Sequence, residues 1–365
     1  MTTLPITHVA TTDLSEMLSP KGGQRMQLPG FDDEFVDFPD YIIRITDRIW
    51  HERKVDMIHQ YYAANCIVHT QTGTVIGAQP VIDNTLATME AYPDRVLDAD
   101  NVIWSQDAPQ PGSDNPVFYS SHLITSKMTN LGPSEFGPAT GNKILVKTIA
   151  DCACRDNGVF EEWLVRDYAA IVAQQGLDVP AVASDLARAD VEAGLDLLAI
   201  HGQGIARVRN GEVPAPPTEV SPEAAPGAFA QHVFKAIWEN QAWGALQDVY
   251  DFRVDGCYPC GRSLYGPDQL QPVLEDLLGA LSDVKVSVDH VCDIGYLGEA
   301  RDVAVRWSLA GKHTGISSYG APIGHDLYLL GISQWRIMRG RIREDVTLWD
   351  DVALRRMIEG ARLRG

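Results

Sequence analysis

The residues best placed for acid–base chemistry in this sequence are histidines and aspartates at the ends of strand-like runs. His313 and His325 flank the glycine-rich stretch TGISSYGAPIG, which lies between two such runs. Asp350 and Asp167 each follow a strand-like run and directly precede a helix-like segment. An aspartate at such a position can act as a general base, but aspartate is also a preferred helix N-cap, so both roles stay open.

A second set of residues could line a binding cavity. His69 ends the run ANCIVHT, and we expect Tyr258 to take the corresponding place in the second half of the chain. His122 lies in YSSHLIT, where strand alternation allows it to face either side. Large aromatic residues more often fill space than bind a specific group. The aromatic candidates for a cavity wall or core are Tyr92, Trp104, Trp163 and Trp307.

The chain contains an internal duplication. Ile49-Trp50 matches Ile237-Trp238 at an offset of 188 residues. FGPATGN from Phe136 matches YGAPIGH from Tyr319 at an offset of 183, and Glu161 matches Glu344 at the same offset. An ordered series of matches whose offset changes only at loops indicates two copies of one structural unit.

Each half has helix-like segments first and long strand-like runs afterwards, which predicts an α+β unit. We expect helices packed on one face of a strongly bent antiparallel sheet, an arrangement that leaves a conical cavity for a small molecule. The predicted organisation is an N-terminal arm (1–37), a first domain (38–177), a helical appendage and proline-rich linker (178–227), and a second domain (228–365). Pro214, Pro216 and Pro217 should lie in extended, exposed chain.

Composition excludes several classes of protein. The formal net charge of −19 over 365 residues repels phosphate backbones and anionic lipid, so we expect neither a nucleic-acid nor a membrane partner. The N-terminus lacks the features of a signal peptide, so we expect a cytoplasmic protein. The six cysteines suggest no disulfide framework, and the pairs Cys152/Cys154 and Cys257/Cys260 lack the second pair that a zinc site needs. We therefore expect no metal site. Nucleotide-binding, serine-hydrolase and metalloprotease motifs are also missing, which argues against a nucleotide-driven enzyme and a serine hydrolase.

Each half resembles the SnoaL-like polyketide cyclases of the nuclear-transport-factor-2-like (NTF2-like) superfamily. The second half carries VRWSLAGKHTGISSYGAPIG and RIREDVTLWDDVAL, and the first carries VHTQTGTVIG, AYPD, FGPATG and VFEEWLVRDYAAIVAQQG. The resemblance spans about 38–177 and 228–360. It implies two NTF2-like (cystatin-like) cones that pack as an internal pseudo-dimer, and a further homo-oligomer stays open.

The resemblance also implies a chemistry, an aldol-type ring closure that needs a base and a donor to the enolate oxygen but no cofactor. Asp350 matches the acid/base aspartate of the family, with Asp167 as its counterpart in the first half, and His313 would be the donor. We expect the second half to hold the active cone, because it alone combines His-Thr-Gly with the closing aspartate. In the first half, Met128-Thr129-Asn130 stands in the place of His-Thr-Gly.

Two alternatives stay open. The same cone could support isomerisation, hydration or hydrolysis of a small carbonyl compound or ester. The chain could also be a non-catalytic protein that binds a small molecule in two degenerate cones.

Overall fold

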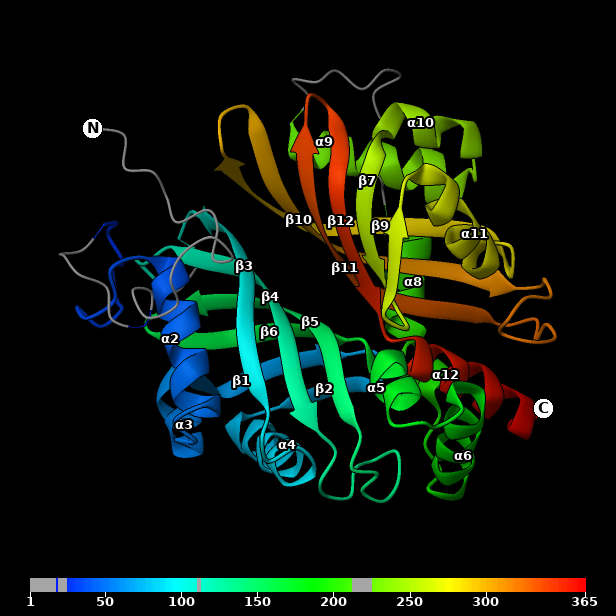
Figure 1. Cartoon of the computed structure of the whole chain (residues 1–365), viewed down its shortest axis with the longest axis horizontal. Coiled ribbons are helices and arrows are strands. Elements are labelled where there is room, and N and C mark those ends of the chain that lie inside the picture. The colour runs from blue at the N-terminus through cyan, green and yellow to red at the C-terminus, as the bar shows by residue number, and fades with distance from the viewer. Residues whose placement is uncertain (1–17, 19–24, 110–112, 212–224) are drawn as a thin grey trace.

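The computed structural model describes residues 18, 25–109, 113–211 and 225–365. Two six-stranded sheets of identical strand order form its framework (Figure 1), with the orders β2-β1-β6-β5-β4-β3 and β8-β7-β12-β11-β10-β9. This identity confirms the duplication. In each unit, helices cover one face of the sheet, and the opposite faces of the two sheets turn toward each other.

The bounds of the elements are as follows. The first unit comprises α2 (Phe38–Trp50), α3 (Ile58–Tyr61), β1 (Tyr62–Thr70), β2 (Gly73–Ile76), α4 (Ala78–Ala91), β3 (Val96–Asp107), β4 (Val117–Thr129), β5 (Lys143–Arg155), β6 (Gly158–Arg166) and α5 (Tyr168–Gln174). Three helices follow it: α6 (Val179–Glu192), α7 (Leu197–Ile200) and α8 (Gly202–Asn210). The second unit comprises α9 (Pro226–Val233), which continues into a π-helical turn (Phe234–Glu239), α10 (Leu246–Val249), β7 (Tyr250–Tyr258), β8 (Arg262–Tyr265), α11 (Pro267–Leu278), β9 (Leu281–Tyr296), β10 (Ala300–His313), β11 (Asp326–Met338), β12 (Arg341–Trp349) and α12 (Asp351–Arg364).

The sheets differ from the expected antiparallel ones in one pairing per unit. The first strand of each unit lies parallel to the last, as β1 with β6 and β7 with β12, while the other neighbouring strands of the described residues are antiparallel. This long-range pairing closes the sheet around the helices. It places β6 near the centre of the first sheet and β12 near the centre of the second.

The two units pack through their sheets. Leu123, Ile149 and Val165 of the first unit form one buried cluster with Leu330 and Leu348 of the second. Hydrogen bonds cross the same boundary. They join Arg306 to Asp151 (2.7 Å), Gln334 to the carbonyl of Ser121 (3.0 Å), and Gln71 to the carbonyl of Tyr328 (2.8 Å). Helices α6 and α8 add to this boundary through the ion pairs Asp190–Arg356 and Arg207–Asp289.

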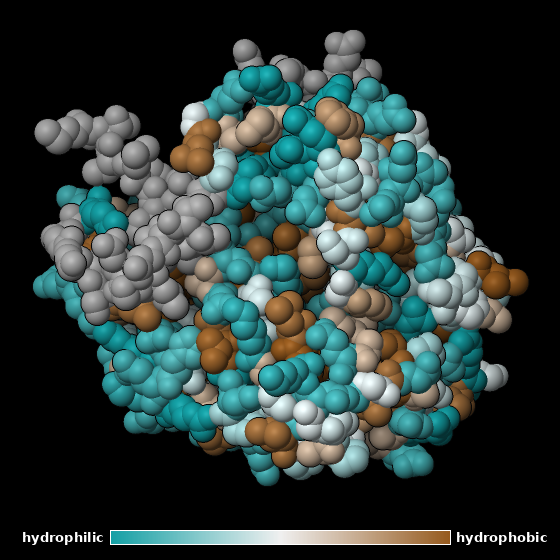
Figure 2. All heavy atoms as spheres, in the orientation of Figure 1, coloured by the Kyte–Doolittle hydropathy of each residue, from teal (hydrophilic) through white to brown (hydrophobic). Residues whose placement is uncertain are grey.

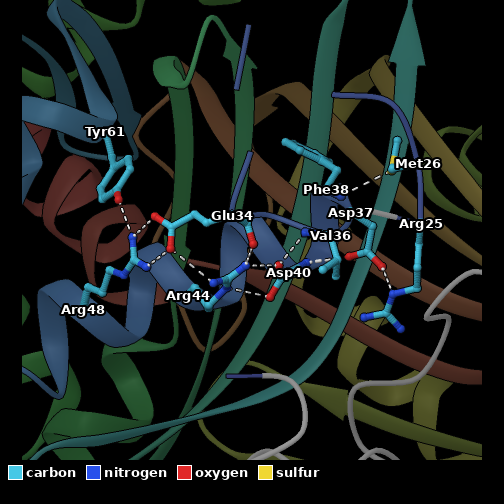
Figure 3. Close-up of polar contacts among 10 residues, drawn as sticks. All are labelled: Arg25, Met26, Glu34, Val36, Asp37, Phe38, Asp40, Arg44, Arg48 and Tyr61. Atoms are coloured by element: carbon cyan, nitrogen blue, oxygen red, sulfur yellow. Dashed lines mark hydrogen bonds and ion pairs between the residues drawn. The ribbon is translucent and has the colours of Figure 1, made fainter. Parts of the chain in front are cut away.

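Residues 25–37 are packed against the first unit, although we expected them to belong to a loose arm. Leu28, Phe31 and Phe35 are buried, and they form one hydrophobic cluster with residues of α2. Helix α2 begins where Asp37 accepts a hydrogen bond from the backbone N–H of Asp40 at 2.8 Å. Figure 3 shows the polar contacts between this segment and α2. The predicted extended prolines, Pro214, Pro216 and Pro217, lie outside the described residues.

Candidate active site

A cavity of about 110 Å³ occupies the cone of the first unit. Helices α2 and α4 form one wall with Ile42, Ile45, Ile49 and Val81, and the sheet forms the other. An outer cavity of about 260 Å³ lies next to it. The two share a set of lining residues, namely Val68, Val81, Asn84, Leu164 and Arg166, so they form an inner and an outer part of one site.

Glu162 is the carboxyl group inside this cone. Strand alternation points Glu162, Leu164 and Arg166 of β6 into the cavity and turns Trp163 and Val165 toward the second unit. The Tyr62 hydroxyl donates a hydrogen bond to Glu162 Oε2 at 3.1 Å. Burial raises the pKa of Glu162 to about 7, against smaller lowering effects of the Tyr62 hydrogen bond and the Arg166 charge. The carboxyl group can therefore exchange a proton near neutral pH.

His122 lies on the same wall. It pairs with Ala150 of β5, and Glu162 pairs with Cys152, two residues further along that strand. The two side chains thus project from β4 and β6 on either side of β5, where a ligand could lie between them. His122 is 3% exposed, its Nε2 has no hydrogen-bond partner, and burial lowers its pKa to about 4. At neutral pH it is an uncharged imidazole that can donate or accept a hydrogen bond.

The cone of the second unit is filled by side chains. Strand register places Trp307, Trp335 and Trp349 where the first unit has Ile124, Cys152 and Arg166, and all three tryptophans are buried. Room for Trp307 comes from a glycine: a Cβ on Gly331 would lie 2.0 Å from the indole ring. The equivalent residue in the first unit is Thr148.

Asp345 is the second-unit counterpart of Glu162, and its carboxylate is saturated. It accepts hydrogen bonds from Tyr258 (2.6 Å), Tyr250 (3.1 Å), Trp335 Nε1 (3.0 Å) and Thr347 (2.6 Å). Burial raises the pKa of Asp345 to about 6, and these four bonds oppose the rise. The second unit thus holds its carboxyl group inside a packed core, an arrangement that does not favour our expectation that this unit holds the active cone.

Asp350 and His313, the expected catalytic pair, occupy different surroundings. Asp350 caps α12 by accepting a hydrogen bond from Ala353 N at 2.9 Å, and it lines the outer cavity of the first unit with Glu135 and Arg356. Burial and then the neighbouring carboxylates raise the pKa of Asp350 to about 7. Asp350 therefore caps α12 of its own unit and also lines the outer cavity of the first unit.

His313 is fully buried at the end of β10 and lines neither part of this site. Neither ring nitrogen has a partner among the described residues, and burial lowers its pKa. Its structural counterpart is Asn130, because His313 N donates to His325 O as Asn130 N donates to Asn142 O. The motif His-Thr-Gly therefore corresponds to Asn130-Leu131-Gly132, two residues beyond the stretch that we had matched to it.

Asp167 joins the two units. It caps α5 through Ala170 N (3.0 Å) and also accepts from Cys260 N (2.9 Å) and Gly261 N (2.8 Å) of the β7–β8 hairpin. Burial raises the pKa of Asp167, and these three backbone hydrogen bonds oppose the rise.

We expect Asp167→Asn to lower the free energy of unfolding by about 1–2 kcal/mol, because asparagine can still cap α5 but offers only one acceptor oxygen to three N–H groups. Urea unfolding would measure the change. If Asp167 were a base, the variant would instead lose activity at unchanged stability.

The remaining predicted residues of the first unit lie away from the cone. His69 bonds Glu161 through Nε2 at 2.8 Å and stacks on Trp163 at 5.2 Å between ring centroids. Trp163 faces the second unit, where the Arg306 guanidinium lies over its ring. Tyr92 is buried, and its hydroxyl accepts a hydrogen bond from Gln175 at 2.9 Å.

The predicted residues of the second unit are structural or exposed. Trp307 and Tyr258 belong to the packed core, and His325 is exposed. By register, the counterpart of His69 is Cys257 and not Tyr258 as expected.

Sequence reasoning missed Glu162, Tyr62, Arg95 and Arg166. The signal was present in VFEEWLVR, because strand alternation separates Glu161 from Glu162 and puts Glu162 and Arg166 on one face. We had matched Glu161 to Glu344, and that pair faces away from the cones.

A larger cleft of about 690 Å³ lies between the two units and is lined by residues such as Lys147, Gln334 and Glu344. Figure 2 shows mixed apolar and polar side chains on the face between the units. No histidine is among the lining residues of this cleft. Among the described residues, no group of three or more His, Cys, Asp or Glu side chains could hold a metal ion. Within that same part of the chain, no helix has the length and apolarity to cross a membrane.

Two α+β units with the same strand order in one chain define a tandem α+β protein. Residues 228–358, which cover most of the second unit, match the family model described as SnoaL-like polyketide cyclase. The first unit repeats the strand order of the second, so the chain contains two units of one topology.

Similar solved structures each span about one unit. A protein assigned as a polyketide cyclase from Acidithiobacillus ferrooxidans is 13% identical, with a TM-score of 0.33 over 38% of this chain and 98% of its own. A SnoaL-like polyketide cyclase from Agrobacterium tumefaciens is 15% identical, with a TM-score of 0.29 over 37% and 98%. An NTF2-like protein from Exiguobacterium is 16% identical, with a TM-score of 0.27 over 34% and 98%. These likenesses concern the fold and do not bear on substrate. No curated protein gave a significant match.

Proposed function

We propose that this protein is a cofactor-independent acid–base enzyme that acts on a small carbonyl compound in the cone of the first unit, by ring closure or isomerisation. The observation that carries the proposal is Glu162, a buried carboxyl group with a pKa of about 7 inside an apolar cavity. A carboxylate without its water is a stronger base, and a pKa near the working pH suits a group that must both take and return a proton.

In the proposed reaction, the Glu162 carboxylate takes a proton from the carbon next to the substrate carbonyl, and the C–H electron pair forms an enolate. His122, in the tautomer that carries its proton on Nε2, donates a hydrogen bond to the enolate oxygen. In ring closure, the enolate carbon attacks a second carbonyl of the same molecule, and the alkoxide that forms takes the proton from Glu162. In isomerisation, the enolate takes that proton back at another carbon. Tyr62 holds the Glu162 carboxylate through its hydroxyl.

The second unit contributes support and the charged residues Asp350 and Arg356. Its own cone is packed with tryptophan, whereas Asp350 lines the outer cavity of the first unit with a pKa of about 7. This position supports a role for Asp350 in proton exchange at the mouth of the site. The proposal therefore assigns one reacting cone to the chain and makes the second unit part of its wall.

The pH dependence of proton abstraction tests the proposal without knowledge of the natural substrate. Exchange of the α-protons of a small ketone, such as cyclopentanone, into D₂O can be followed by NMR after subtraction of the rate without protein. The base must be deprotonated, so the protein-dependent rate should rise about tenfold per pH unit below pH 7 and level off above it. A rate that is flat or falls between pH 6 and 8 would contradict the proposal. Absence of exchange in a panel of such ketones that do bind would favour the non-catalytic alternative.

A further inference from the structure

One end of the first cone gathers hydrogen-bond donors that have no partner among the described residues. The buried atoms are Arg95 Nη1, Arg166 Nε and Thr148 Oγ1, and all three residues line the inner cavity. Buried polar groups are nearly always paired in native proteins. Three unpaired donor groups at one end of one cavity therefore indicate a ligand that accepts hydrogen bonds.

The fold brings these three groups together. Arg166 ends β6 and pairs in register with Thr148 of β5. Arg95 immediately precedes β3 and crosses to β4, where its Nε and Nη2 donate to Ser126 Oγ at 3.2 and 3.0 Å. Its guanidinium lies over the Trp50 ring at 4.4 Å, and its Nη1 has no hydrogen-bond partner among the described residues.

The positive charge of these two arginines is not balanced by a carboxylate in contact. Among the described residues, neither Arg95 nor Arg166 forms an ion pair. Arg44 and Arg48 of the same unit show the ordinary arrangement, because both pair with Glu34 and Arg44 also pairs with Asp40 (Figure 3).

The nearby carboxyl groups do not supply the missing charge. The Arg166 charge lowers the pKa of Glu162 and Glu135, but burial outweighs it in both, and among the described residues neither carboxyl group forms an ion pair with Arg166. Burial and the second guanidinium lower the pKa of Arg95. A buried charge of this kind is costly unless an opposite charge joins it.

We infer that the ligand of the first cone is an organic carboxylate, whose carboxylate group binds Arg95, Arg166 and Thr148 while its apolar body extends toward Glu162 and His122. Arginine binds carboxylates through paired N–H donors, and the apolar cavity walls exclude a fully hydrated inorganic anion. This inference rests on the proposed function, which places the reacting end of the ligand at Glu162 and His122. Arg166 lies four residues beyond Glu162, about 13 Å along a strand, so the reacting carbon is separated from the carboxylate by several bonds.

The test compares a keto acid with its uncharged ester. 5-Oxohexanoate and methyl 5-oxohexanoate carry the same ketone, and calorimetric titration measures the binding of each to the full chain. We expect the acid to bind at least tenfold more tightly, and Arg166→Gln and Arg95→Gln to remove that advantage without weakening the ester. Arg48→Gln is the matched control, and it should bind both as the wild type does. Urea unfolding of the unliganded variants measures what the arginines contribute to stability through contacts such as Arg95 with Ser126, and unchanged ester binding shows that each variant is folded.

Each outcome separates this inference from the proposed function. Equal binding of acid and ester, or binding of inorganic phosphate as tight as that of the acid, would overturn the carboxylate assignment and leave ketone exchange by Glu162 untouched. Glu162→Gln should bind 5-oxohexanoate at least as tightly as the wild type while it loses exchange. Carboxylate binding without any Glu162-dependent exchange would support the anion site and contradict the proposed reaction.

Discussion

Replacing Glu162 by glutamine should lower α-proton exchange by about 10²–10⁴-fold with the fold intact, because the amide keeps the shape of the side chain but cannot accept the proton. The variant should also be more stable than the wild type at alkaline pH. A carboxyl group whose pKa is raised by folding favours the folded state below its unfolded pKa, and this contribution is lost as the pH rises through about 7. The gain at pH 8 should reach at most about 3 kcal/mol and should vanish near pH 4. Denaturant unfolding at the two pH values measures it.

Asp345→Asn provides the matched control, since Asp345 occupies the same register position in the second unit. Its carboxylate accepts four hydrogen bonds in a packed core, so the variant should lose stability and keep its exchange activity. Loss of exchange in Asp345→Asn, together with normal exchange in Glu162→Gln, would move the reacting site to the second unit.

Trp307→Ala should have the largest effect on stability, a loss of about 3–5 kcal/mol, because it opens a cavity in the filled second cone. The indole packs over Gly331 and donates to Ser333 at 3.0 Å, so no neighbouring side chain can take its place without rearrangement. Chemical denaturation measures the loss, and exchange activity measured below the unfolding transition should be unchanged.

Trp307→Phe keeps most of the apolar volume, so it provides a folded variant for the test if Trp307→Ala does not fold. It should cost less stability and should likewise leave exchange unchanged. A stable Trp307→Phe protein that loses exchange or ketone binding would show that the second cone takes part in the reaction after all.

The fold was largely predictable because it depends on local periodicity repeated twice. Matches such as Ile49-Trp50 with Ile237-Trp238 established two units, and helices followed by long strands established an α+β cone. The parallel pairing of β1 with β6 was not predictable, because it joins residues about a hundred positions apart. The packing of residues 25–37 was also missed, since their aromatic side chains lack a helical or strand period.

The site was less predictable, because it depends on which side chains meet inside the cone. Asp350 and Asp167 were ambiguous between base and cap, and both are caps, although Asp350 also lines the outer cavity. Whether a cone is open depends on side-chain volume at matched positions, as with Cys152 and its counterpart Trp335. That comparison needs the strand register. Our alignment of the His-Thr-Gly motif was two residues out of register, so it did not match Asn130 with His313.

A crystal structure of Glu162→Gln soaked with 5-oxohexanoate would test most directly the claim that the first cone is the reacting site. The account predicts the ligand in the inner cavity, with its carboxylate on Arg95 and Arg166 and a carbon next to its ketone within about 3.5 Å of the Gln side chain that replaces Glu162. A ligand bound instead in the cleft between the units, or in a rearranged second cone, would contradict it.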